Sequence, residues 1–135
     1  MSKIHPSAIV HKNAKIADSV SIGPFCVVGE NVEIRENCIL LSHCSITGYT
    51  KIGSDNKFFP FVSIGSEPQD YAFKGTKSFI KIGNGNVFRE GFTVNPGTKE
   101  NSETIIGNNC YFMMNSHIAH NCKVGNKVIL VNCAQ

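Results

Sequence analysis

Apolar residues recur at every sixth position along almost the whole chain. Counting in sixes from Ile4 to Leu130 gives 22 positions, and 19 of them hold Val, Ile, Leu or Phe. Chance placement of such residues would fill only about 7 positions. A period of six matches neither the 3.6 of an α-helix nor the alternation of a long strand. It predicts a short strand and a turn, repeated so that equivalent residues stack and bury a continuous core.

The other positions of the six-residue unit, or hexad, are also biased. Gly often follows the apolar residue, and a small or β-branched residue often stands four positions after it. Five of the six cysteines occupy this small position, namely Cys26, Cys38, Cys44, Cys110 and Cys122. A residue type that follows the repeat so closely acts as a small apolar side chain. We therefore expect packing roles for the cysteines, not disulfides or metal ligands.

The repeat is broken at only three positions, Asp70, Thr76 and Glu100. These lie in two insertions, at about 66–79 and 99–104, after which the repeat resumes in phase. Long loops inserted into a coil whose other turns are short are usually functional. The sequence thus predicts one domain, 1–135, with two insertions that we expect to carry function.

Composition and charge exclude several classes of protein. With 15 Ile and 11 Val but only 3 Leu, the chain is poor in helix formers and a helical bundle is excluded. No apolar run is long enough to span a membrane. The net charge of +3 comes from scattered basic residues, so no nucleic-acid-binding surface is expected. The first residues do not resemble a secretory signal, so we expect a cytoplasmic protein.

Two histidines flank an apolar position of the repeat in the segment His117-Ile118-Ala119-His120. Ile118 is expected to face the core, so His117 and His120 should project from the outer wall. A neutral imidazole is suited to take a proton from a hydroxyl near neutral pH. The spacing alone leaves catalysis, a metal site and a structural role open.

Several motifs together resemble one family of enzymes. They are the hexads, Ile22-Gly23-Pro24-Phe25-Cys26, Ser63-Ile64-Gly65 leading to Gln69-Asp70, and His117-Ile118-Ala119-His120. In combination they resemble the UDP-N-acetylglucosamine O-acyltransferases, over essentially the whole chain. The resemblance implies an all-β fold, a left-handed parallel β-helix with three hexads in each coil.

The resemblance also implies a reaction, the first step of lipid A biosynthesis. His120 would be the general base that takes the proton of the sugar 3-hydroxyl as this attacks the thioester of acyl-acyl carrier protein. Asp70, Gln69 and His117 would bind the UDP-N-acetylglucosamine. No cofactor is implied beyond the phosphopantetheine thioester, which is a co-substrate. The implied partners are acyl carrier protein and two further copies of the chain, because the family's site lies between the subunits of a homotrimer.

The chain departs from the family at several positions. Ala72 stands where the family often has a substrate-binding lysine, and Lys74 is the nearest substitute. Asn95 replaces a histidine near the substrate, keeping hydrogen bonding but not charge, and Asn121 replaces an aspartate. The chain also stops at Gln135, inside a hexad, whereas the family continues with more coils and a helical domain. We therefore expect these 135 residues alone to lack acyltransferase activity.

The sequence alone is also compatible with other functions. Ala72 and Asn95 are compatible with an N-acyltransferase that acts on an amino-sugar nucleotide. A zinc-dependent hydratase on the same fold would need three histidines at a subunit interface, and the His117-to-His120 segment supplies two. A purely structural solenoid would favour flat arrays of repeated threonine, whereas the outward positions here are varied.

Overall fold

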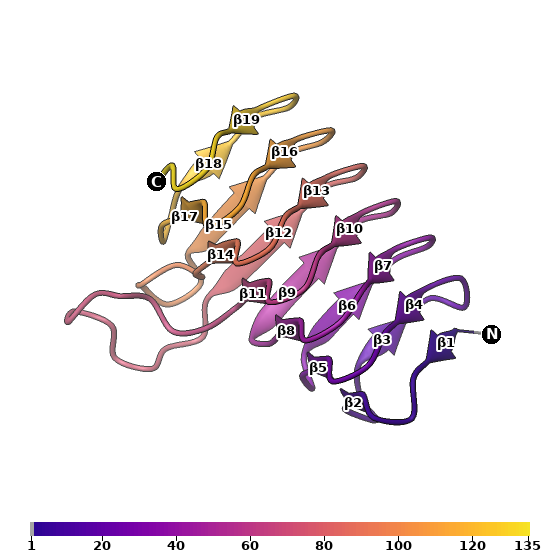
Figure 1. Ribbon diagram of the computed structural model, residues 1–135. Helices are drawn as coiled ribbons and strands as arrows, with labels where there is room; N and C mark the ends of the chain where they lie inside the picture. The colour runs from indigo at the N-terminus through magenta and orange to yellow at the C-terminus, as the bar shows by residue number, and fades with distance from the viewer. Residues whose placement is uncertain (1) are drawn as a thin grey trace.

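The computed structural model describes residues 2–135, and every regular element in that range is a β-strand. Nineteen short strands form three parallel sheets, which we call A, B and C. Each coil of the chain adds one strand to each sheet in turn, so the molecule is a three-sided solenoid. Figure 1 shows the coils stacked in sequence order from the N-terminus to the C-terminus.

The strands are short because a turn follows every few residues. Sheet A contains β1 (Lys3–Ile4), β4 (Ser21–Ile22), β7 (Ile39–Leu40), β10 (Lys57–Phe58), β13 (Val87–Phe88), β16 (Tyr111–Phe112) and β19 (Ile129–Leu130). Sheet B contains β2 (Ile9–Val10), β5 (Val27–Val28), β8 (Ser45–Ile46), β11 (Ser63–Ile64), β14 (Thr93–Val94) and β17 (His117–Ile118). Sheet C contains β3 (Lys15–Ile16), β6 (Val32–Ile34), β9 (Tyr49–Ile52), β12 (Phe79–Ile82), β15 (Glu103–Ile106) and β18 (Lys123–Val124).

The register of the strands confirms that the hexads stack. Ile4 pairs with Ile22, so one plain coil consists of three hexads. Phe58 pairs with Phe88, which is farther along the chain because the first excursion lies between β11 and β12. The second excursion lies between β14 and β15. β12 begins at Phe79 and β15 at Glu103, so the excursions end at residues 78 and 102.

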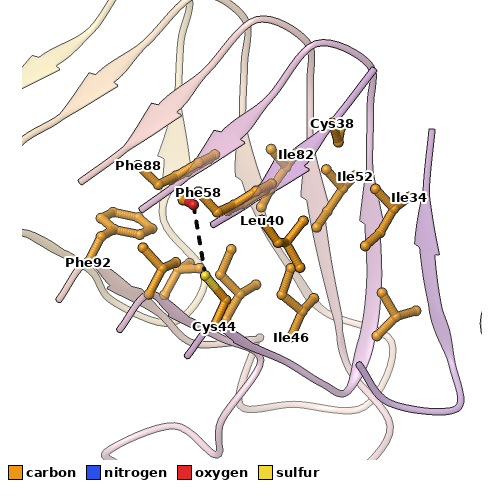
Figure 2. Packing of buried hydrophobic residues seen from close by; sticks show 14 of the residues in the cluster. Ile34, Cys38, Leu40, Cys44, Ile46, Ile52, Phe58, Ile82, Phe88 and Phe92 are labelled. Carbon is orange, nitrogen blue, oxygen red and sulfur yellow. Dashed lines mark hydrogen bonds between the residues drawn. The ribbon is translucent and has the colours of Figure 1, made fainter. Parts of the chain in front are cut away.

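The predicted apolar positions form the core. Buried members of the series are Ile22, Val28, Ile34, Leu40, Ile46, Ile52, Phe58, Ile64, Ile82, Phe88, Val94, Ile106, Phe112 and Ile118. In sheet A three of them form an aromatic stack, with ring centroids 4.7 Å apart for Phe58 and Phe88 and 5.2 Å for Phe88 and Phe112. Figure 2 shows Phe92 beside the Phe88 ring, inside the same core. Full burial of each such side chain contributes about 1.5–3 kcal/mol.

The prediction for the cysteines is correct for four of the five. Cys26, Cys38, Cys44 and Cys110 are buried, and Figure 2 shows Cys44 with its Sγ directed towards the carbonyl oxygen of Phe58, 3.9 Å away. The prediction is wrong for Cys122, which is exposed. It precedes β18, the last strand of sheet C, and no described strand stacks over that coil.

Polar side chains close the corner between sheets C and A. Asn56 and Asn86 are buried, at 1% and 0% exposure, and lie one above the other in successive coils. The backbone N–H of Asn86 donates to Oδ1 of Asn56 at 2.8 Å, and the N–H of Cys110 donates to Oδ1 of Asn86 at 2.8 Å. The amide Nδ2 atoms donate to the carbonyl oxygens of Gly83 and Gly107. Every buried side-chain N or O atom within residues 2–135 has a hydrogen-bond partner.

The first excursion is the most prominent feature outside the coil. Figure 1 shows it as a long loop that projects from the solenoid between β11 and β12. Its beginning is fixed by Pro68, which is buried, whereas Tyr71 at its tip is fully exposed. No helix in the described part of the chain is long and apolar enough to cross a membrane.

Candidate functional site

The candidate site lies at the outer face of sheet B, in the last coils. β14 and β17 are neighbours in this sheet, and Thr93 pairs with His117. Because Val94 and Ile118 face the core, Thr93 and His117 face outwards. The Oγ1 of Thr93 and the Nδ1 of His117 are 2.7 Å apart, so a hydrogen bond fixes the His117 ring against the wall.

His120 and Asp70 meet at the edge of this face. His120 follows β17 in the corner between sheets B and C, and Asp70 comes from the first excursion. The Nε2 of His120 lies 3.6 Å from Oδ2 of Asp70, and both side chains are about one-third exposed, at 36% and 33%. The other carboxylate oxygen, Oδ1, accepts a hydrogen bond from the backbone N–H of Ala72 at 2.9 Å, which fixes the carboxylate. The fold therefore brings together an imidazole and a carboxylate that are far apart in the sequence.

Asn95 lies beneath the loop and is only 5% exposed. Its Nδ2 donates to the carbonyl oxygen of Ser66 at 3.1 Å, at the start of the first excursion. Its own carbonyl oxygen accepts a hydrogen bond of 2.7 Å from Oγ1 of Thr104. In this structure Asn95 therefore joins the start of the Asp70 loop to the coil that follows.

The remaining predicted residues lie on the loop itself. Gln69 is exposed and, together with Pro68, Asp70 and Tyr71, lines a cavity of about 390 Å³. Lys74 is also exposed, farther along the same loop. The loop therefore gathers Gln69 and Asp70 at one cavity, and Asp70 also contacts His120.

Sequence reasoning missed two threonines at the site. Thr93 holds His117, and Thr98 contacts Asn121, whose side chain in turn contacts Nδ1 of His120. Thr93 could have been found from the repeat, because it occupies the same outward position as His117 in the preceding coil. Thr98 follows β14 in the second excursion, where the repeat gives no register, so no comparable signal was available.

Within residues 2–135, no group of three or more His, Cys, Asp or Glu side chains is arranged to hold a metal ion. The pair of His120 and Asp70 supplies two possible ligands, and the Nδ1 of His117 is already hydrogen-bonded to Thr93.

The chain is similar to known proteins along most of its length. The family model described as bacterial transferase hexapeptide (six repeats) matches residues 1–36, 13–48 and 103–135. The acyl-[acyl-carrier-protein]–UDP-N-acetylglucosamine O-acyltransferase of Psychrobacter sp. is 46% identical over 126 residues, 93% of this chain and 49% of the relative. The protein of the same name from Thermodesulfovibrio yellowstonii is 42% identical over 135 residues, 99% of this chain and 52% of the relative.

A solved structure agrees in fold. The crystal structure of UDP-N-acetylglucosamine O-acyltransferase (LpxA) from Moraxella catarrhalis superposes with a TM-score of 0.91 at 44% identity, covering 96% of this chain and 51% of that one. Together with the three parallel sheets, this match confirms the predicted left-handed parallel β-helix and the resemblance seen in the motifs. The chain spans about half the length of the curated relatives that it matches.

Proposed function

Because the chain belongs to the bacterial transferase hexapeptide family, and its relatives there are UDP-N-acetylglucosamine O-acyltransferases, we propose that it forms the catalytic part of such an enzyme. The reaction moves a (3-hydroxy)acyl chain from acyl carrier protein to the 3-hydroxyl of UDP-N-acetylglucosamine. In the relatives' pathway this step begins lipid A biosynthesis. The proposal includes a cytoplasmic location, a reducing compartment that would keep the six free thiols reduced.

The approach of His120 to Asp70 carries this proposal. A neutral imidazole accepts a proton at the nitrogen that bears no hydrogen, and here Nε2 is directed to the same space as the carboxylate. The sugar 3-hydroxyl would lie beside both groups and give its proton to Nε2 as its oxygen attacks the thioester carbonyl. The tetrahedral intermediate then collapses, the C–S bond breaks, and the phosphopantetheine thiolate leaves with a proton returned from the His120 imidazolium.

Asp70 has two tasks in this scheme. Its fixed carboxylate would accept hydrogen bonds from the sugar hydroxyls, and its charge would stabilise the imidazolium that forms on His120. Gln69, beside it at the cavity, would contribute a neutral donor and acceptor. His117, held by Thr93, would contact substrate from the adjacent wall through its free nitrogen. The exposed Lys74 would bind the nucleotide phosphates in place of the lysine absent at 72.

Assembly is part of the proposal, because the outer faces differ strongly in character. The outward positions of sheet C are mostly charged, with Lys15, Glu33, Lys51, Lys81 and Lys123, and Ile105 of β15 is the apolar member of the same row. Those of sheets A and B include exposed Ile9, Val27, Ile39 and Ile129. Three prisms that pack through faces A and B, with face C in solvent, would cover these apolar residues. This arrangement is a homotrimer, with each site on sheet B facing a neighbouring copy.

The corner between sheets A and B supports the same arrangement. Phe25 and Phe61 are about 60% exposed, and His43 lies between them with ring centroids 5.1 and 5.0 Å away. All three residues have positive φ, a conformation that disfavours bulky side chains. A packed neighbour would offset that cost by burying the rings.

The assembly is tested by sedimentation of the chain and of two variants. We expect a species of three times 14.7 kDa that Phe61→Asn weakens at least tenfold, because asparagine suits the positive φ but removes the apolar ring. The control Lys51→Asn, on the charged face, should sediment as the unmodified chain. A monomer at every concentration would contradict the proposed trimer.

The reaction is tested in a hybrid protein, in which residues 1–135 are joined in register to the half of the Psychrobacter relative that they do not match. The hybrid should acylate the 3-hydroxyl of UDP-N-acetylglucosamine, and a 3-amino analogue should react much more slowly. The intact relative serves as the positive control. Faster acylation of the 3-amino analogue would favour the N-acyltransferase instead.

A further inference from the structure

A cavity of about 320 Å³ lies on the outer face of sheet C, in the first three coils. Figure 1 shows the strands beneath it, β3, β6 and β9, in successive coils. Every side chain that lines this sheet C cavity carries a polar group. Cavities of about 300–1,000 Å³ are typical of sites for small molecules.

Three lysines that are far apart in the sequence line the sheet C cavity. Lys15 and Lys51 lie in one outward row, because each of them pairs with Glu33 on the strand between them. Neighbouring strands are about 4.8 Å apart, so the Cα atoms of the two lysines are about 10 Å apart. Lys77 stands two residues before β12, at the end of the first excursion. Stacking of the coils thus gathers basic residues that are scattered along the sequence.

The Lys77 side chain is held over the sheet. Its Nζ lies 4.6 Å from the centroid of the Tyr49 ring and 5.7 Å from that of Phe79, both within the range of cation–π attraction. The two rings pack edge to face on neighbouring strands, with centroids 5.8 Å apart. The carbonyl oxygen of Lys77 accepts a hydrogen bond of 2.8 Å from the N–H of Asn101. Both the side chain and the backbone of Lys77 are therefore fixed beside the cavity.

The three lysines have no negative partner. None of the ion pairs within residues 2–135 includes Lys15, Lys51 or Lys77. The carboxylate of Glu33, which lies between two of them, is paired with Arg35 instead, with 3.7 Å between Oε1 and Nη2. Arg35 does not line the cavity and offsets the charge of Glu33 from outside it. The ammonium groups are thus available for charge-assisted hydrogen bonds to an anion such as phosphate.

The remaining side chains of the sheet C cavity are suited to hydroxyl groups. The amides of Asn13 and Asn31 and the phenol of Tyr49 can each donate and accept hydrogen bonds. Glu30 accepts at Oε1 from Nδ2 of Asn13 at 3.2 Å, and its Oε2 is left as an acceptor. A carboxylate beside the lysines repels a bare polyanion but accepts from neutral hydroxyls. The cavity therefore complements a ligand that carries both a phosphate and hydroxyl groups.

From these contacts we propose that the sheet C cavity binds a sugar phosphate. The phosphate would accept hydrogen bonds from Lys15, Lys51 and Lys77, and the sugar hydroxyls would donate to Glu30 and exchange hydrogen bonds with the asparagine amides. The proposal goes beyond the acyl transfer given above and assigns a site that does not include His120. In the proposed trimer sheet C faces solvent, so a ligand could reach the cavity in the assembly.

Titration of the ¹⁵N-labelled 135-residue chain with glucose 6-phosphate, followed by NMR of the backbone amides, tests this proposal. At about 0.15 M ionic strength, where charges are screened beyond about 8 Å, we expect one saturable site with a dissociation constant of about 1 mM or below. The shifted amides should be those of the lining residues on β3, β6 and β9 and of Lys77. Inorganic phosphate should bind at least about tenfold more weakly, because it makes no hydroxyl contacts, and glucose should not bind measurably.

Two variants remove single charges from the cavity. Lys51→Met and Lys77→Met keep the apolar part of the side chain, and each should weaken binding at least about tenfold. Lys123→Met is the matched control, because Lys123 belongs to β18 of the same sheet and does not line the cavity. This control should bind as tightly as the unmodified chain. With two cavity variants, the result does not depend on the folding of either one.

Three results would overturn the proposal. They are no saturation at about 10 mM glucose 6-phosphate, equal affinity for this ligand and inorganic phosphate, and an equal loss in Lys123→Met and the cavity variants. The second result would show an unselective anion site, and the third a diffuse effect of charge. The titration needs no acyl donor or sugar nucleotide, so its failure is distinct from failure of the proposed acyl transfer.

Discussion

Removing the side chain of Asn86 should destabilise the solenoid more than any exposed substitution. Asn86 is fully buried, and its amide makes two hydrogen bonds at the corner between sheets C and A. Nδ2 donates to the carbonyl oxygen of Gly107 at 2.9 Å, and Oδ1 accepts from the N–H of Cys110 at 2.8 Å. In Asn86→Ala both backbone groups lose their partner, the N–H of Cys110 in a buried place and the carbonyl oxygen of Gly107 in a partly buried one.

The expected cost follows from these two groups. A buried donor or acceptor without a partner costs about 1–3 kcal/mol, so the pair costs about 2–6 kcal/mol. A domain has a total stability of only about 5–15 kcal/mol, so the loss would be a large fraction of it. Asn126→Ala is the matched control, because Oδ1 of Asn126 accepts from the N–H of Asn108 at 2.8 Å in an exposed position. Water can replace that bond, so the control should cost under about 1 kcal/mol.

Urea unfolding followed by circular dichroism measures both variants against the unmodified chain. The midpoint of Asn86→Ala should fall well below that of Asn126→Ala, with a similar slope because the surface exposed on unfolding is unchanged. Equal midpoints for the two variants would contradict this prediction, since burial would then make no difference to the loss of these bonds.

Two further predictions concern the core and the coil spacing. The exposed Cys122 should react with iodoacetamide in the folded chain. Cys38 should react only after unfolding, because burial raises the pKa of the Cys38 thiol. Equal labelling of the two cysteines by mass spectrometry would contradict this prediction. Gly53→Ala should cost about 1–3 kcal/mol in urea unfolding, because its Cβ would lie 2.6 Å from the carbonyl oxygen of Gly83. Gly125→Ala, with open space around it, should be neutral, and equal costs for the two would be the contrary result.

The apolar core positions could be predicted because every coil needs the same kind of residue at the same place. A stacked wall needs an apolar residue at the same place in each coil, so Ile22, Leu40 and Phe58 are recognisable by spacing alone. The buried polar positions could not be predicted in this way. Asn56 and Asn86 occupy positions that elsewhere hold cysteine, and only the stacking of coils shows that their amides satisfy buried backbone groups.

The sequence predicted candidate site residues but not how they are arranged. The motifs pointed to His120 and Asp70, yet their separation depends on how the first excursion folds back, and an excursion has no repeat to fix its register. The contact of Thr98 with Asn121 could not be predicted for the same reason. Sequence patterns thus identify residues on the regular coil well, whereas contacts made by the loops require the structure.

In the proposed reaction, His120 is the base in transfer of an acyl chain to a sugar hydroxyl. Its most direct test is the initial rate of acyl transfer from acyl carrier protein to UDP-N-acetylglucosamine by the hybrid protein, with His120 and with His120→Ala. We expect measurable transfer by the first and a loss of at least about a hundredfold in the second, with the fold and sugar-nucleotide binding retained. Equal rates for the two proteins would contradict it.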